Sequence, residues 1–349
     1  MRKAFTPLKI KHLTLANRLV LPPMALDQAT EHGEVTTKLL EHYLLRVQSN
    51  RGKSSEKKTF RAKVGMIIVE HAYVCASGRA HPCQLGIDQD RLIPGLRLLV
   101  EEVHNEGIPV GIQLSHAGAR ALNFPVGPSE ISCPYLVRYG KDQESVLKEL
   151  PRELSKEEIR QLVVTFAKAA QRARKAGFDF LEIHGAHGYL LNQFYSPLTN
   201  QRSDEYGGNL ERRLKFPLEV IKAIKDEVGS AMPVFYRLGA DDRSPGGNTV
   251  QDSIRIVPLL EKAGIDCLDL SGGISGYPRK GPRGFFNYLA EAIKPITNIP
   301  VLVTGGITEI GMAEDLIRTG TADLVGIGRA LLADPQWVAK AWQRLLGPE

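Results

Sequence analysis

The chain has 349 residues, of which 43% are apolar and 24% charged, and its formal net charge is +6 at pH 7. These proportions are typical of a soluble globular protein. No window approaches the roughly 18 apolar residues that a membrane span needs, and no apolar stretch follows the N-terminus as in a signal peptide. We therefore expect a cytoplasmic protein with no membrane partner.

Eight short apolar runs recur along the chain, each followed by a helix-like segment. They are rich in Val and Ile and apolar on both faces, which is typical of buried parallel strands. In chain order, the predicted strands are residues 18–23, 64–70, 108–114, 178–184, 232–238, 265–271, 299–306 and 322–328.

Amphipathic segments between these runs predict helices, and the segment 155–177 is the clearest. Ser155 and Glu158 have the spacing of a capping box at its start, and Gly177 is a typical residue just past a helix end. Three further segments follow the same plan, two of them interrupted by a proline: 210–229, 249–264 and 308–320.

Eight strands that alternate with helices predict a (β/α)8 TIM barrel in a single domain, residues 1–349, rather than a six-stranded doubly wound sheet. Residues 46–63 hold much of the basic surplus and a single acidic residue. This pattern favours a solvated loop over a nucleic-acid patch, so we expect no nucleic-acid partner. Residues 115–150 are too long for a simple connection and are expected to cap the mouth of the barrel.

Active sites of such barrels form at the carboxyl ends of the strands, and this chain gathers polar and glycine residues there. Near the last two strands, Gly305, Gly306 and Gly328 would let main-chain N–H groups approach an anion, and Arg329 would add a charge-assisted contact. These loops form the usual phosphate site of the fold, so the sequence indicates a phosphate-bearing ligand. The alternative is that the glycines serve only tight turns.

The segment "HGAHGYLL" follows the fourth predicted strand. Two imidazoles aimed at one point there can hold a carbonyl oxygen, and the hydroxyl of Tyr189 can supply a proton. His184 and His187 would also suit a metal ion, but no third ligand is placed to complete a site, with only His71 and His116 elsewhere at the rim. We therefore expect His184, His187 and Tyr189 to be catalytic, and we expect no metal.

These residues belong to longer matches with a known family. "HGAHGYLLNQFYSPLTNQRSDEYGGNLERR" (184–213) closely resembles the signature of the Old Yellow Enzyme family, the FMN-dependent NAD(P)H:flavin oxidoreductases and ene-reductases. "NRLVLPPM" (17–24), "QLSHAGAR" (113–120), "VTGGI" (303–307) and "GIGRALLADP" (326–335) match other family segments in the same order. The resemblance spans essentially the whole chain and implies the same barrel with FMN at its mouth.

The resemblance also implies how the cofactor is held. Pro23, Met24 and Ala25 would line the flavin, and Gln113 would hydrogen-bond its pyrimidine end. Arg237 would lie near N1 and O2, where positive charge stabilises the anionic reduced flavin. The phosphate would be held by Gly305, Gly306, Gly328 and Arg329.

For the reaction, the resemblance implies that His184 and His187 hold the carbonyl oxygen of an activated alkene. Hydride passes from flavin N5 to Cβ, and Tyr189 gives a proton to Cα. The chain departs from the family pattern at Ala25, where many relatives carry Thr or Cys, and at Asp27, near where some relatives place a substrate-facing aromatic. We therefore expect the redox potential and the substrate range to differ from those of such relatives.

The sequence as a whole predicts an FMN-dependent ene-reductase that reduces α,β-unsaturated carbonyl compounds with NADH or NADPH, as a homodimer or homotetramer. Two alternatives stay open. One is a flavin barrel of the tRNA dihydrouridine synthase kind, which would need an added RNA-binding domain. The other is a non-flavin phosphate-binding barrel, for which Glu70 is the candidate base.

Overall fold

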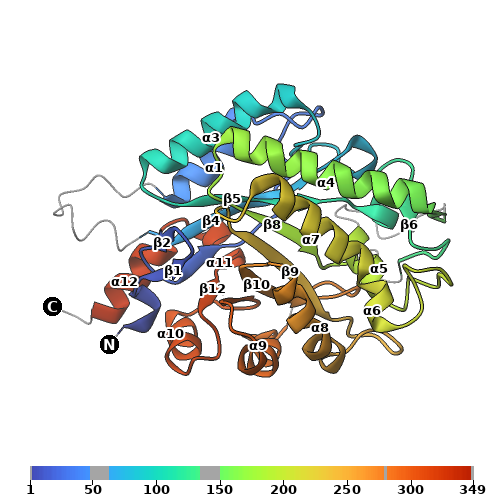
Figure 1. The fold of residues 1–349 in the computed structure, drawn as a ribbon. Helices are drawn as coiled ribbons and strands as arrows, with labels where there is room; N and C mark the ends of the chain where they lie inside the picture. Colours follow the sequence, from blue (N-terminus) through green and yellow to red (C-terminus); the bar gives the residue numbers. More distant parts are fainter. Residues whose placement is uncertain (1, 48–62, 134–149, 279–280, 347–349) are drawn as a thin grey trace.

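Eight parallel strands form a closed barrel at the centre of the molecule, in the spatial order β10-β11-β12-β3-β4-β5-β8-β9 (Figure 1). The structure is a computed structural model, and it describes residues 2–47, 63–133, 150–278 and 281–346. All eight predicted strands are present, so the prediction of a (β/α)8 barrel is confirmed. Their bounds are β3 (Leu19–Leu21), β4 (Met66–Tyr73), β5 (Val110–Ser115), β8 (Phe180–Gly185), β9 (Val234–Asp241), β10 (Cys267–Gly272), β11 (Val301–Thr304) and β12 (Leu324–Gly326).

Helices cover the outside of the barrel, and at least one follows each strand along the chain (Figure 1). The main helices are α1 (Thr37–Val47), α3 (Ile93–Asn105), α4 (Lys156–Ala176), α7 (Lys215–Val228), α8 (Val250–Lys262), α9 (Asn287–Ile293), α10 (Ile310–Arg318) and α12 (Trp337–Leu346). The shorter ones are α5 (Leu190–Tyr195), α6 (Leu210–Arg213) and α11 (Arg329–Ala333). Among the described residues, no helix is both long and apolar enough to cross a membrane.

Helix α4 begins and ends as the sequence predicts. The hydroxyl of Ser155 accepts the main-chain N–H of Glu158 at 3.2 Å, and the Glu158 carboxylate accepts the N–H of Ser155 at 2.8 Å. Gly177 then ends the helix in the left-handed conformation, with φ of 95°. The capping box and the glycine stop are therefore both confirmed.

The predicted helix 210–229 is instead two helices, α6 and α7, which break at Leu214. Pro217 explains the break, because its ring would clash with a carbonyl one turn earlier in a continuous helix. Restarting the helix just before Pro217 places the proline in the first turn, where no main-chain N–H is required.

Apolar side chains fill the inside of the barrel at the end where the strands begin. Phe180 and Phe235 stack there, with ring centroids 4.5 Å apart. An antiparallel hairpin that the sequence did not predict, β1 (Leu8–Ile10) with β2 (Leu13–Leu15), adds three buried side chains to the same cluster. The hairpin closes this end, so polar groups inside the barrel meet solvent only at the other.

The basic segment 46–63 is anchored at both of its described ends. Arg46 is only 8% exposed and donates to the main-chain oxygen of Leu331 at 3.1 Å. Lys63 forms an ion pair with Glu106 at 2.6 Å. The expectation of a solvated loop is therefore wrong for these two residues, because each meets an acceptor on a packed neighbour. The rest of the segment lies outside the described residues.

The expected capping segment 115–150 is described only up to residue 133 and at residue 150 itself. Its described part includes β6 (Val126–Gly127), which pairs in parallel with β7 (Arg152–Glu153) just beyond the segment. A capping role for the whole segment stays a prediction.

Phe180→Ala is expected to lower the free energy of unfolding by about 3–5 kcal/mol, the usual cost of removing a buried phenyl ring. Phe180 is fully buried, and the closed strands around it cannot collapse into the cavity. Chemical denaturation of both proteins measures the difference. Leu45→Ala is the control, because Leu45 is 55% exposed and its truncation should cost less than about 0.5 kcal/mol. Equal losses in the two variants would contradict the central role given to Phe180.

Candidate active site

A layer of buried polar side chains lies directly above the apolar base of the barrel. Side chains alternate between the two faces of a strand, so Glu182 faces the same side as Phe180, two residues earlier. Gln113 donates from Nε2 to Oε1 of Glu182 at 2.7 Å. On the neighbouring strands, Nε of Arg237 lies 3.1 Å from Oδ2 of Asp269. One guanidinium thus shares a closed space with two carboxyl groups.

Burial decides the charges of this layer. It raises the pKa of Glu182 well above its usual range, and the nearby Asp269 raises it further, while Arg237 opposes both effects. Burial also raises the pKa of Asp269 to about 6, again against Arg237. Glu182 therefore keeps its proton at neutral pH, and Asp269 balances Arg237. The sequence signal for this layer was an acidic residue inside each of two apolar runs, and neither Glu182 nor Asp269 was among the predicted site residues.

His184 lies on strand β8 itself, and the tight turn that follows the strand presents His187. His187 and Gly188 both adopt left-handed conformations, with φ of 58° and 67°. This conformation is uncommon for a residue with a side chain, and hydrogen bonds to the main-chain groups of the turn hold it in place. His187 donates its N–H to the oxygen of Gly272 at 3.1 Å, and its carbonyl accepts from the guanidinium of Arg120. Gly188 donates to Oδ1 of Asn192 at 2.8 Å. The sequence "HGAHG" thus places its first histidine at the end of the strand and its second in the turn.

The structure brings His184, His187 and Tyr189 together, as the sequence predicts. The ring centroids of His184 and His187 are 5.2 Å apart, and those of His184 and Tyr189 are 4.8 Å apart. His71, from strand β4, which β5 separates from β8, lies 5.3 Å from Tyr189 and 6.2 Å from His184 by the same measure. His187 also contacts the ring of Tyr277 at 5.3 Å. The result is a continuous group of aromatic rings at the carboxyl ends of the strands.

His184, His187 and Tyr189 are uncharged at neutral pH. Burial lowers the pKa of His184 well below its usual value, with His187 and Arg237 adding to the effect. Burial and then Arg237 do the same to the pKa of His187. Burial raises the pKa of Tyr189 to about 12, so its hydroxyl keeps its hydrogen. Each neutral imidazole therefore has one N–H donor and one acceptor nitrogen, and the phenol offers an O–H. Nε2 of His187 already lies 2.6 Å from Oγ of Ser271, which leaves Nδ1 for a ligand.

Glu70 anchors the loop that follows β3. Its Oε2 accepts the main-chain N–H of Leu26 at 2.8 Å, and the residue is 1% exposed. Its own N–H donates to the hydroxyl of Tyr43 at 2.9 Å. Glu70 is therefore a structural anchor in this arrangement, which does not favour its use as the base of a non-flavin barrel.

The loop held by Glu70 carries the three residues predicted to line the flavin. Pro23 is buried, Met24 is half-buried and Ala25 is exposed. Met24 borders the predicted phosphate segment, since a Cβ on Gly328 would come within 2.9 Å of its sulfur. The structure thus brings the loop after β3 next to the end of β12.

The other residues predicted to hold the phosphate lie around the ring of Phe285, which was not predicted to be near the site. A Cβ on Gly305 would lie 2.9 Å from the ring of Phe285, and one on Gly306 would lie 2.8 Å from it. The guanidinium carbon of Arg329 is 5.9 Å from the centroid of the same ring. Gly305, Gly306 and Arg329 therefore converge on one place. Phe285 carries no local signal of this, because it lies in the connection before α9.

Several buried polar atoms near the strand ends have no hydrogen-bond partner among the described residues. They include Oγ of Ser115, Nδ1 of His184 and Oγ1 of Thr304. A buried polar atom without a partner costs about 1–3 kcal/mol, so such atoms commonly mark the place of a ligand. In the described part of the chain, no group of three or more His, Cys, Asp or Glu side chains is placed to hold a metal ion.

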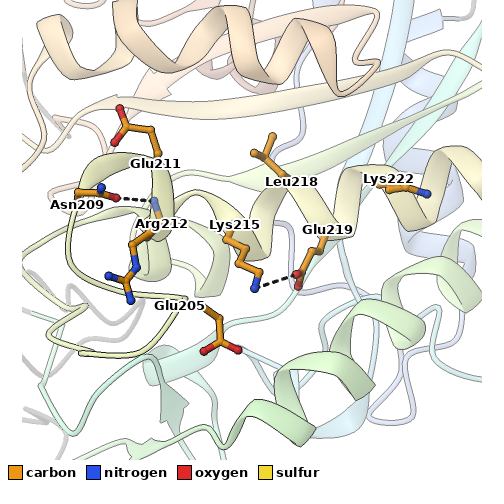
Figure 2. A pocket seen from close by; sticks show the side chains of 8 residues that line it. All are labelled: Glu205, Asn209, Glu211, Arg212, Lys215, Leu218, Glu219 and Lys222. Atoms are coloured by element: carbon orange, nitrogen blue, oxygen red, sulfur yellow. Dashed lines mark hydrogen bonds and ion pairs between the residues drawn. The ribbon is translucent and has the colours of Figure 1, made fainter.

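A shallow depression on the outer helices contains none of the predicted residues (Figure 2). Its charged side chains form ion pairs on the surface, as Lys215 does with Glu219 at 3.8 Å and Lys222 with Asp226 at 2.7 Å. Asn209 caps α6 by accepting the main-chain N–H of Arg212 at 2.9 Å. The lining residues are Glu205, Asn209, Glu211, Arg212, Lys215, Leu218, Glu219 and Lys222. Because these charges are paired with neighbouring side chains, the depression is an ordinary charged part of the outer surface.

Known proteins resemble this chain over nearly its full length. The sequence profile of the NADH:flavin oxidoreductase / NADH oxidase family matches residues 3–346. An NADH oxidase of Thermoanaerobacter brockii is 40% identical over 97% of this chain and 50% of its own length. An NADPH dehydrogenase of Clostridium acetobutylicum is 37% identical over 96% of this chain and 93% of its own.

Solved structures agree with the sequence matches. The Old Yellow Enzyme homologue from Zymomonas mobilis superposes with a TM-score of 0.82 at 25% identity, over 99% of this chain and 93% of that one. The chain spans about half the length of some of the curated relatives it matches, and nearly all the length of others.

The burial of Glu70 should make stability depend on pH. Burial raises the pKa of Glu70 from 4.5 to about 7, against main-chain hydrogen bonds from Leu26 and Asp27. The folded protein therefore binds this proton more tightly than the unfolded chain does. The resulting stabilisation is full below pH 4.5 and is lost as the pH rises through about 7.

Glu70→Gln cannot ionise, so its free energy of unfolding should fall by about 3 kcal/mol less than that of the wild type between about pH 4.5 and pH 8. Urea denaturation at both pH values measures this, and the contributions of other buried acids such as Asp269 cancel in the comparison. The same fall in both proteins would show that folding does not raise the pKa of Glu70.

Proposed function

Because this chain belongs to the NADH:flavin oxidoreductase / NADH oxidase family, we propose that it is an FMN-dependent ene-reductase. FMN is the cofactor of this family, and NADH or NADPH is its reductant. The proposed substrates are α,β-unsaturated carbonyl compounds. The observation that carries the proposal is the group formed by His184, His187 and Tyr189 at the end of β8.

The residues at the mouth fit FMN. Buried polar atoms lack partners there, and Arg237 supplies a positive charge that the barrel holds in place. Gln113 and Arg237 would hold the pyrimidine end of the flavin, beside the loop with Pro23, Met24 and Ala25. The phosphate would be held by Gly305, Gly306, Gly328 and Arg329. When bound, FMN supplies the hydride that it takes from NADH or NADPH.

The two histidines would bind the carbonyl oxygen of the alkene. Both imidazoles are neutral, so each can donate one N–H hydrogen bond to the same oxygen. His187 would donate from Nδ1, because its Nε2 lies 2.6 Å from Oγ of Ser271. Negative charge develops on this oxygen as the alkene is reduced, and fixed donors stabilise that charge. A single donor of this kind is commonly worth about 100- to 1000-fold in kcat.

Tyr189 would supply the proton. Its pKa of about 12 keeps the phenol protonated at neutral pH, and its ring lies against that of His184, which would hold the carbonyl. The hydride adds to Cβ and the phenolic proton to Cα, so the C=C bond gains two hydrogens. The phenolate then recovers its proton from solvent.

The purified protein is expected to be yellow and to release FMN on denaturation. The absorbance spectrum should show flavin bands that bleach when NADPH or NADH is added without oxygen. Chromatography of the released chromophore identifies it. A colourless protein that takes up no added FMN would contradict the proposal.

Tyr189→Phe should lower kcat for alkene reduction by about 100- to 10,000-fold, the usual contribution of a general acid. Bleaching of the flavin by NADPH or NADH should continue, because that step needs no proton from Tyr189. Stopped-flow absorbance separates the two steps. Tyr206→Phe is the matched control, since its hydroxyl bonds to Glu219 on the outer helix α7 at 3.0 Å. Undiminished alkene reduction by Tyr189→Phe would remove Tyr189 from the mechanism.

A further inference from the structure

Gln84 fixes the state of a third histidine at the mouth, His71. The side-chain oxygen of Gln84 accepts the main-chain N–H of Ala80 at 2.6 Å, which sets the orientation of the amide. Its Nε2 then lies 2.9 Å from the main-chain oxygen of His71 and 2.7 Å from Nδ1 of the same residue. An amide nitrogen only donates, so both of its hydrogens point at His71.

Nδ1 of His71 must therefore accept a hydrogen bond and carry no hydrogen. The ring is the neutral tautomer with its hydrogen on Nε2, because any hydrogen on Nδ1 would face the amide N–H of Gln84. Burial, followed by His81 and Arg237, lowers the pKa of His71 to about 3, in agreement with this assignment. Nε2 makes no hydrogen bond to any residue in the described part of the chain.

A strand irregularity places this ring beside the proposed catalytic group. The pairing of β4 with β5 shifts between Val69 and Ala72, and His71 lies within the shifted segment. Such bulges turn side chains in directions that a regular strand does not allow. The ring of His71 contacts those of Tyr189 and His184, with centroids 5.3 Å and 6.2 Å away.

We propose that His71 is a specificity-determining residue that donates a hydrogen bond from Nε2 to a second acceptor on the substrate. This inference rests on the proposed function, in which His184 and His187 hold the first carbonyl oxygen. The substrate class is then activated alkenes with an acceptor on each side of the double bond, such as cyclic imides and other unsaturated dicarbonyl compounds. A neutral donor selects for an uncharged oxygen rather than for an anion.

Binding of two saturated compounds to the FMN-loaded protein tests the proposal. Succinimide has two carbonyl oxygens and cyclohexanone has one, and calorimetry gives the affinity of each. His71→Phe keeps a ring but removes the donor, so it should bind succinimide about tenfold more weakly, the effect of one neutral hydrogen bond. Its affinity for cyclohexanone should stay within about twofold of the wild type. Equal changes for the two compounds, or no measurable binding of succinimide by the wild type, would overturn the proposal.

Two further variants test whether His71→Phe changes binding through a general effect on the structure. His32→Phe is the matched control, because His32 is exposed and lies outside the group of rings, and its two affinities should be those of the wild type. Gln84→Met keeps His71 but removes the amide that fixes its tautomer, so its affinity for succinimide should fall between those of the wild type and His71→Phe. An unchanged affinity in Gln84→Met would contradict the role given to Gln84.

Nitrogen NMR of histidine-labelled protein reads the tautomer directly, without any reaction. His71 should show Nδ1 without hydrogen and Nε2 with hydrogen at neutral pH, and Gln84→Met should mix the two tautomers. A hydrogen on Nδ1 in the wild type would overturn the proposal.

Turnover separates this inference from the proposed function. In the wild type, kcat/KM is measured for maleimide and for 2-cyclohexenone. If neither alkene is reduced, the proposed function fails, while the binding comparison still decides the role of His71. If both are reduced, His71→Phe should lower kcat/KM for maleimide about tenfold more than for 2-cyclohexenone. Equal losses would overturn the proposal for His71 and leave the ene-reductase proposal standing.

Discussion

Closure of the eight strands is the constraint on which every part of the site depends. In a closed barrel each inward-facing side chain has a strand on both sides and no free edge to turn toward. The hairpin and the stacked phenylalanines fill one end. The polar residues further along the strands therefore reach solvent at one end only. The charge of Arg237 must therefore be balanced by Asp269 within the barrel, beside the protonated Glu182, and this fixes where the guanidinium lies.

The charge of Arg237 extends to the rings above it. It contributes to the lowered pKa values of His71, His184 and His187, for each of which burial is the larger cause. The three neutral imidazoles offer N–H donors at fixed positions and add no positive charge to the site. It should distinguish ligands by the positions of their oxygens more than by their charge.

What the sequence could predict was local. The strands, the caps of α4 and the turn with His184, His187 and Tyr189 each have their signals within a few neighbouring residues. The hairpin of β1 and β2 could not be predicted, because strands of 3 residues are stable only against the barrel that they cover. The tautomer of His71 could not be predicted either, since it depends on Gln84, 13 positions away.

The pairing of β3 with β12 joins the beginning of the chain to its end. The two strands pair Leu19 with Val325 and Val20 with Gly326. Nearby, the N–H of Lys3 bonds to Glu314, 311 positions away. During synthesis, β3 has no partner on one side until the last strand emerges, so the growing chain is an open sheet with free edges. Such edges can pair with other chains and cause aggregation. This risk ends only when the final strand closes the barrel.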